Sequence, residues 1–166
     1  MSLVTAGMTM NLSVTQELTT QADGASSANR KVMSDQFNKS VTMIPTGTAG
    51  TLGTVGISQK IALSSGAKTV DLTSLQDING GTVSASSKKL RALLLGNPSG
   101  NAAMTFTVGG TNGYTALGAS FVIVLQPKQK ILAYLEDGAA TIDSTHKTID
   151  VTGTGSQSFE IAAVFG

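Results

Sequence analysis

The sequence contains no cysteine, no tryptophan and a single histidine among its 166 residues. Without cysteine the chain has neither a disulfide framework nor a thiol nucleophile. His146 is the only imidazole that could serve as a general base or a metal ligand. Two tyrosines and five phenylalanines leave few aromatic platforms for sugars or bases. We therefore expect a protein that is not an enzyme and that holds no cofactor and no metal.

Charged residues are also scarce, at 13% of the chain, about half the usual share. The surface must then consist mostly of hydroxyls and backbone, which suits packing against neighbours, although abundant threonine also follows from strand propensity alone. A net charge of +1 provides no long-range attraction to nucleic acid or to an anionic membrane. The basic clusters Lys88-Lys89-Arg91 and Lys128/Lys130 are interpreted as solvated strand ends. We expect neither nucleic acid nor membrane as a partner.

The first residues lack a basic stretch followed by an apolar one, which is the pattern of a secretory signal. No window approaches about twenty uninterrupted apolar residues, so a helical membrane span is not expected. We expect a protein made in a cytoplasm and kept there or released by lysis. The length is sufficient for a real core without disulfides or a structural metal.

Short β-type segments with alternating side chains fill the chain. Apolar and polar residues alternate over 8–15, and the same two-residue period returns at Met104–Val108 and Phe159–Phe165. Such segments follow one another roughly every 8–12 residues between glycine-containing turns, the pattern of an antiparallel β-sandwich or barrel. The sequence predicts an all-β protein with an N-terminal strand and arm or long polar loop over 1–45 and a β-sandwich domain over 46–166.

Two segments, Leu90–Leu95 and Phe121–Leu125, are apolar at consecutive positions. Both faces of such strands are expected to be covered, so we predict that the two strands are central. A second sheet covers one face; a loop, the N-terminal arm or another subunit covers the other. This pattern favours a homo-oligomer.

The polar stretch 19–40 and the glycine-rich stretch 46–56 interrupt the strand pattern. The first fits either a long excursion with one helical turn near Arg30–Phe37 or an arm that orders against a partner. The second spaces its glycines by three but lacks the residues of a phosphate-binding loop. We interpret it as a flexible linker or an irregular edge.

Candidate chemical groups are few. His146 follows Asp143-Ser144-Thr145, where a Ser-His-Asp triad is conceivable, but such close neighbours seldom reach that geometry, and an Asx or Ser turn before a strand at 148–152 is favoured. Asp137, Asp143 and Asp150 lack the spacing of a dense calcium loop, which leaves a loop calcium site as a minor alternative. Tyr114, in an exposed glycine-rich loop, would either anchor a partner or cover the end of the sandwich.

Several segments together resemble small structural proteins of tailed bacteriophages. The strand and turn patterns that carry the resemblance, over about two-thirds of the chain, are Ile57–Leu63, Thr69–Leu72, Leu75–Val83, Lys89–Asn97, Phe121–Pro127 and Gly155–Gly166. The resemblance implies a jelly-roll-like sandwich, a location in the virion, and a head decoration or cement protein that binds the major capsid protein, with trimers favoured. The N-terminal segment would then be an arm across neighbouring capsid subunits.

Alternatives from other classes are a tail or fibre component that contacts host glycans through loops near Tyr114 and Pro127, and a non-catalytic carbohydrate-binding β-domain. The absence of tryptophan lowers the expectation for the carbohydrate-binding domain. The candidate partner contacts are Leu3, Val4, Met8, Met10, Leu12, Tyr114 and Pro127.

Overall fold

A computed structural model describes residues 5–10, 15–19, 29–33, 39–44, 53–77, 80–136 and 140–166. Two compact units divide the chain. The hairpin unit is Gly7–Val41, and the sandwich unit comprises Met1–Ala6 together with Thr42–Gly166. The sequence-based division falls after residue 45, a few residues beyond the end of the hairpin unit.

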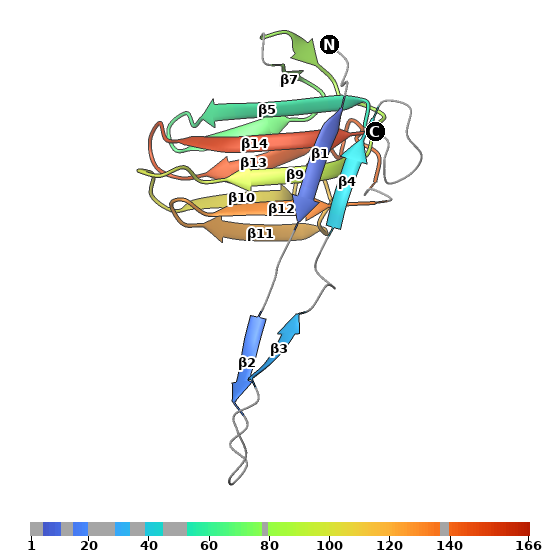
Figure 1. Cartoon of the computed structure of the whole chain (residues 1–166). Coiled ribbons are helices and arrows are strands. Elements are labelled where there is room, and N and C mark those ends of the chain that lie inside the picture. Colours follow the sequence, from blue (N-terminus) through green and yellow to red (C-terminus); the bar gives the residue numbers. More distant parts are fainter. Residues whose placement is uncertain are drawn as a thin grey trace, which may run out of the picture. The chain divides into compact units, whose positions relative to one another are not determined.

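The N-terminal strands form two small antiparallel ladders (Figure 1). Strand β1 (Ala6–Met10) pairs with β4 (Lys39–Met43), and β2 (Thr15–Thr19) pairs with β3 (Asn29–Met33). The register of β2 and β3 is continuous from Thr15 opposite Met33 to Thr19 opposite Asn29. The β2–β3 ladder therefore has no irregularity over its described length.

The helical turn expected near Arg30–Phe37 is wrong where the structure describes this segment. Residues 29–33 form strand β3, while 34–38 lie outside the described residues. Periodicity alone could not distinguish a helical turn from a strand in this segment. Its backbone is extended because β3 pairs with β2, and no local sequence pattern records that pairing.

Two four-stranded sheets make the body of the sandwich unit. Their strands are β5 (Val55–Ala62), β6 (Ala67–Asp71), β9 (Leu90–Gly96), β10 (Met104–Gly109), β11 (Ser120–Leu125), β12 (Lys130–Tyr134), β13 (Thr148–Thr152) and β14 (Ser158–Phe165). A separate two-stranded hairpin, β7 (Leu75–Gln76) and β8 (Thr82–Val83), lies between β6 and β9 in the sequence.

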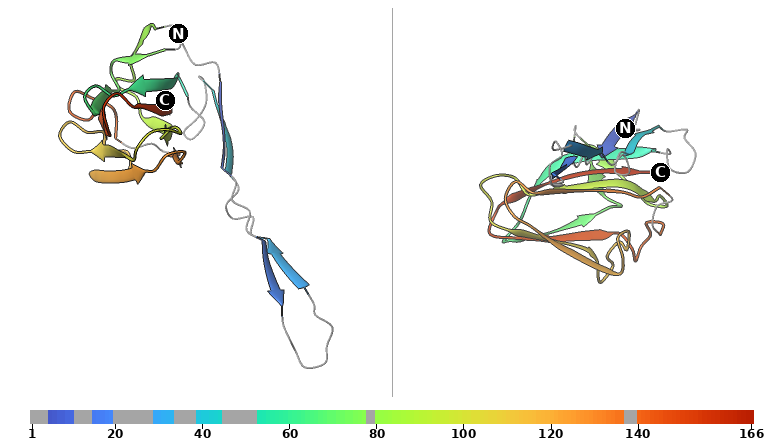
Figure 2. Two further views of the ribbon diagram at one scale, coloured as in Figure 1. Left: turned by 90° about the vertical axis from the view of Figure 1, so that its left-hand side faces the viewer. Right: turned by 60° about the horizontal axis from the view of Figure 1, so that its bottom comes forward.

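The strand order is β11-β10-β13-β6 in one sheet, here the β13 sheet, and β12-β9-β14-β5 in the other, the β14 sheet. All pairs are antiparallel. Successive strands of the sandwich change sheet at every connection except the one from β10 to β11, and the two sheets lie face to face (Figure 2). The predicted all-β antiparallel sandwich is confirmed.

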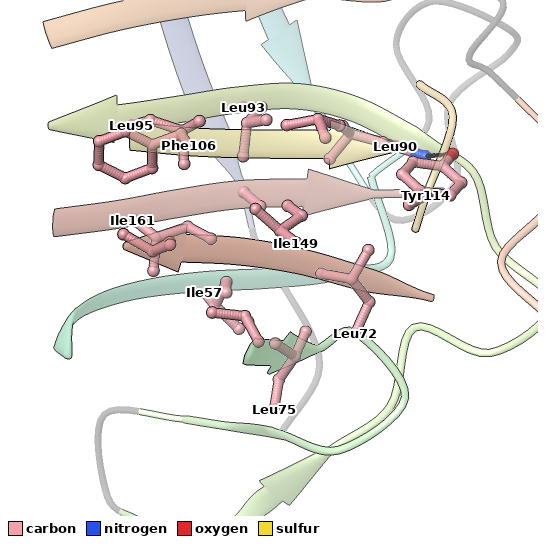
Figure 3. Packing of buried hydrophobic residues seen from close by; sticks show 14 of the residues in the cluster. Ile57, Leu72, Leu75, Leu90, Leu93, Leu95, Phe106, Tyr114, Ile149 and Ile161 are labelled. Carbon is pink, nitrogen blue, oxygen red and sulfur yellow. Dashed lines mark hydrogen bonds between the residues drawn. The ribbon is translucent and has the colours of Figure 1, made fainter. Parts of the chain in front are cut away.

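The core lies between the two sheets and is made by the inward side chains of alternating positions (Figure 3). Met104, Phe106 and Val108 are fully buried on β10, and the apolar positions of β14 face them. Phe106 and Phe159 meet edge to face, with ring centroids 5.9 Å apart and planes at 83°, an arrangement that aromatic pairs prefer. The two-residue period in the sequence of these segments therefore marks the residues that face the core.

Strand β9 is central, as the apolar run Leu90–Leu95 predicts. It lies between β12 and β14, and nearly all of its residues are buried. Leu93 and Leu95 belong to the core between the sheets, whereas Leu94 is half-buried on the other face. The pairing with β14 shifts by one residue between Val164 and Phe165, so that Leu90 also faces the core.

One of the expected glycine-containing turns lies at Ser65-Gly66, between β5 and β6. Both residues have positive φ, 51° and 84°, the backbone of a type I′ turn, and Ser64 and Ala67 exchange backbone hydrogen bonds across it. Of the glycine-rich stretch, residues 46–52 lie outside the described part. Its end, Val55 and Gly56, is already in β5 rather than in a linker.

Candidate interaction surface

Strand β11 is an edge strand, contrary to the prediction for Phe121–Leu125. It pairs with β10 alone among the described strands, and its exposure alternates along its length. Val122 and Val124 are 55% and 53% exposed, while Phe121 and Ile123 pack against the core. An apolar run has the same composition whether its second face is covered or open, so the sequence could not distinguish these cases. The structure thus exposes two valines that the sequence assigns to the interior.

Val122 and Val124 belong to the outer face of the β13 sheet, which extends across all four of its strands. Short and mostly β-branched side chains occupy it, and we call it the threonine–valine face. Its two cross-strand rows are Val124, Thr105, Thr152, Ala67 and Val122, Thr107, Asp150, Thr69. Asp150 is the one charged member, and it accepts a hydrogen bond from the Thr69 hydroxyl at 2.6 Å. The face therefore has low relief and low charge.

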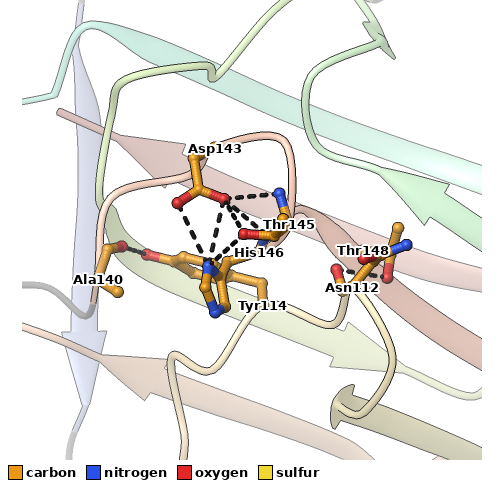
Figure 4. Close-up of polar contacts among 7 residues, drawn as sticks. All are labelled: Asn112, Tyr114, Ala140, Asp143, Thr145, His146 and Thr148. Carbon is orange, nitrogen blue, oxygen red and sulfur yellow. Dashed lines mark hydrogen bonds and ion pairs between the residues drawn. The ribbon is translucent and has the colours of Figure 1, made fainter.

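Tyr114 is not a surface contact, which corrects one of the two readings of its loop. Its side chain is fully buried. The hydroxyl accepts a hydrogen bond from the Leu90 N–H at 3.0 Å (Figure 3) and donates to the Ala140 carbonyl at 2.7 Å (Figure 4). Burial raises the pKa of Tyr114 above its usual value. The tyrosine therefore closes the end of the sandwich, which is the second of the two alternatives that the sequence left open.

The conformation of this loop depends on Gly113. A Cβ at that position would lie 2.2 Å from the Gly109 carbonyl carbon, far inside any allowed contact. The close approach of the two glycine backbones tightens the loop, and the next residue donates its N–H to the Thr148 carbonyl at 2.9 Å. The loop is thereby tied to β13 at the point where the Tyr114 ring enters the core.

The segment around His146 is an Asx turn, as favoured over a triad. Oδ1 of Asp143 accepts hydrogen bonds from the Thr145 N–H at 2.7 Å, the Thr145 hydroxyl at 2.9 Å and the His146 N–H at 2.8 Å (Figure 4). The same oxygen lies 3.2 Å from Nδ1 of His146. These donors, the Thr145 N–H foremost, hold the pKa of Asp143 well below its usual range. The turn directly precedes β13, so the Asp143 carboxylate fixes the backbone that leads into this strand.

A second acidic side chain, that of Asp71, is also held by neighbouring groups. Asp71 accepts hydrogen bonds from the Thr73 N–H and hydroxyl, and forms an ion pair with Lys147 at 2.8 Å. Burial opposes ionisation of Asp71, but these donors outweigh it and lower its pKa. Asp137 lies outside the described residues. Within the described part of the chain, no three His, Cys, Asp or Glu side chains gather as a metal site would require.

One of the basic clusters differs from its expected role. Arg91 is buried instead of solvated, and its Nη1 donates to the Glu136 carbonyl at 2.7 Å. Its position at the register shift between β9 and β14 explains this, because the shift breaks the alternation of the strand. Lys128 and Lys130 are exposed as expected, and Lys130 pairs with Glu160 at 2.6 Å.

The other candidate contact residues differ in burial, and some lie outside the described residues. Met8 and Met10 lie in β1, and the Met8 side chain is buried. Pro127 is exposed in the turn between β11 and β12. Leu3, Val4 and Leu12 lie outside the described residues. Sequence reasoning missed three exposed apolar residues, Ile44, Val122 and Val124. No sequence pattern marks the two valines, because every residue of Phe121–Leu125 is apolar.

No family model matches the chain, and neither a curated protein nor a solved structure is found to be similar to it. Among the described residues, no helix has the length and apolar character needed to cross a bilayer. The interaction surface therefore has to be interpreted from its own residues.

Proposed function

We propose that this chain is a structural protein of a tailed-bacteriophage virion that decorates the outside of the mature head. It is made in the host cytoplasm and binds major capsid subunits, stabilising the head by bridging them. Its work is done by surface contact, without catalysis or a cofactor. The hairpin unit binds the capsid and thereby attaches the sandwich, which is the rigid body of the protein.

The observation that carries this proposal is the β2–β3 ladder. Among the described strands, these two pair only with each other. A two-stranded ladder in water is marginally stable, and a third strand or a packed face is needed to hold it. A capsid subunit would supply that support by packing against the five paired positions from Thr15 to Thr19.

The sandwich supports the proposal by its order and by its surface. Numbered from β5 to β14 without the β7–β8 hairpin, its strands follow the order 6-3-8-1 in one sheet and 5-4-7-2 in the other. This order supports the jelly-roll type of sandwich, which is common in viral capsid proteins. The low charge of the threonine–valine face suits wide, flat contacts.

The stabilising effect follows from linkage. A protein that binds only the expanded lattice shifts the equilibrium toward that lattice by its binding free energy. A contact of about 800 Å² per partner is sufficient for a specific interface, and repetition over several subunits multiplies the effect. The resemblance to phage proteins favours trimers at symmetry positions of the head, where the capsid lattice would hold the three copies together.

A variant that shortens the hairpin tests this proposal. Replacement of Thr15–Met33 by a short glycine–serine turn removes the β2–β3 ladder and keeps β1, β4 and the sandwich. We expect this variant to fold, to co-sediment poorly with expanded capsids of the encoding phage, and to lose the rise in capsid disruption temperature that the full chain produces.

The matched control keeps the hairpin and alters the sandwich surface far from it in sequence. Ser156→Ala, in the turn before β14 and outside the threonine–valine face, removes one exposed hydroxyl and should leave capsid binding unchanged. Equal capsid binding by the shortened variant would contradict the proposal. Glycan-array binding by the full chain without capsid affinity would favour the tail or fibre alternative.

A further inference from the structure

The edges of the two sheets differ in one respect. The four edge strands are β11 and β6 in the β13 sheet, and β12 and β5 in the β14 sheet. Three of them carry a lysine: Lys68 in β6, Lys130 in β12 and Lys60 in β5. Strand β11, Ser-Phe-Val-Ile-Val-Leu, carries no charge, no proline and no glycine. Charged side chains on an edge strand are a common device against pairing with other chains, and β11 lacks that device.

The open side of β11 is also regular. Its pairing with β10 runs without a shift from Leu125 opposite Met104 to Ser120 opposite Gly109, so no bulge turns the strand away. At its end, the Asn97 side chain donates to the Leu125 carbonyl at 2.8 Å. Asn97 is fully buried and also binds the Ala102 carbonyl at 2.9 Å, so the end of the strand is fixed in place.

We infer that β11 pairs with β11 of a second copy of this chain, antiparallel and around a two-fold axis at Ile123. Side chains alternate with a period of two, so the faces of the two sheets match only if residues of the same face stand opposite each other. Centred on Ile123, the pairing sets Val122 opposite Val124 of the second copy and Phe121 opposite Leu125. Every cross-strand pair between Phe121 and Leu125 is then apolar.

Because β11 is complementary to itself, the strand that pairs with it is assigned to a second copy of this chain. A strand of Val, Ile, Phe and Leu with no charge has the composition of segments that pair with themselves. Pairing would cover Val122 and Val124, which are 55% and 53% exposed, and would join two four-stranded β13 sheets into one of eight strands. The threonine–valine face would continue across the axis. The inference goes beyond capsid binding and does not depend on it.

Light scattering of the full chain tests the pairing without any capsid. At about 100 μM, an association with a Kd of order 10 μM is largely formed, and the mass should be twice 16.8 kDa. V122K/V124K places four lysines around the axis and should weaken self-association by more than about tenfold, because like charges across an interface are unfavourable.

The matched control is A67K/T69K on the other edge of the same sheet. Ala67 and Thr69 are exposed and spaced like the two valines, and Thr69 stands opposite Asp150. This variant should remain a dimer, with circular dichroism confirming the fold of both variants. A monomer at all concentrations, a trimer, or a dimer that survives V122K/V124K would each overturn the inference.

Disulfide trapping gives a second readout that does not depend on lysine being tolerated. The chain has no cysteine of its own, so V122C and V124C each introduce a single thiol. Mixed together, the two variants should form a disulfide-linked dimer under mild oxidation, with little from either variant alone, because the register sets 122 opposite 124. No cross-link in the mixture, or equal cross-linking of V122C alone, would contradict the pairing.

Discussion

At the scale of single residues, Tyr114 joins segments that lie far apart in the sequence. Its hydroxyl is the hydrogen-bond acceptor of the Leu90 N–H at the start of β9 and the donor to the Ala140 carbonyl. The bond to Leu90 is made where water is excluded, since Tyr114 and Leu90 are fully buried, whereas Ala140 is exposed. A single oxygen therefore satisfies two backbone groups at the closed end of the sandwich.

Removal of this oxygen should be costly. In Tyr114→Phe the ring still fills its site, but the buried Leu90 N–H loses its partner, which typically costs about 1–3 kcal/mol. We expect the free energy of unfolding, measured by urea denaturation, to fall by that amount with an unchanged slope. A loss below about 0.5 kcal/mol would show that the bond contributes no more than an average surface contact.

At the scale of elements, the two faces of strand β9 lie in different environments. Leu93 faces the core between the sheets and is 1% exposed, while its neighbour Leu94 is half-buried on the opposite face. Leu93→Ala should cost about 2–5 kcal/mol of unfolding free energy, because a cavity remains in a packed core.

Leu94→Ala is the control for this prediction, because it removes the same atoms from the same strand. It should cost clearly less, since a half-exposed site can collapse or admit water. Thermal unfolding of both variants measures the difference. Equal losses would mean that β9 does not sit with the described face toward the core.

The strands were predictable from the sequence, whereas their neighbours were not. The alternation at Phe159–Phe165 records which face of β14 is buried, so the core positions could be read directly. The run Phe121–Leu125 records only that both kinds of position are apolar. Whether such a strand is central depends on strand order, which is set by long-range pairing, and β11 proved to be an edge.

The same limit applies to the candidate surface. The loop before Tyr114 has the composition of an exposed loop, but the close approach of Gly113 to Gly109 draws the tyrosine inward. By contrast, the Asx turn at Asp143 was predictable because its bonds reach only two and three residues along the chain. Local chemistry could be read from the sequence, and the surface formed by distant strands could not.

At the scale of the whole molecule, two compact units of different character share one chain. The sandwich unit has a continuous core between its sheets, whereas the hairpin unit contains two-stranded ladders. This division agrees with the proposed roles of a rigid body and a segment that a partner stabilises. The β11 edge adds a second surface, through which copies would join independently of the capsid.

The most direct test of the proposed function is the position of the chain in a particle. Electron cryomicroscopy of expanded capsids of the encoding phage, incubated with the full chain, should show added density on the outer surface. We predict that the hairpin unit lies against a major capsid subunit. Density confined to the tail, or capsids that remain bare at saturating protein, would contradict the account.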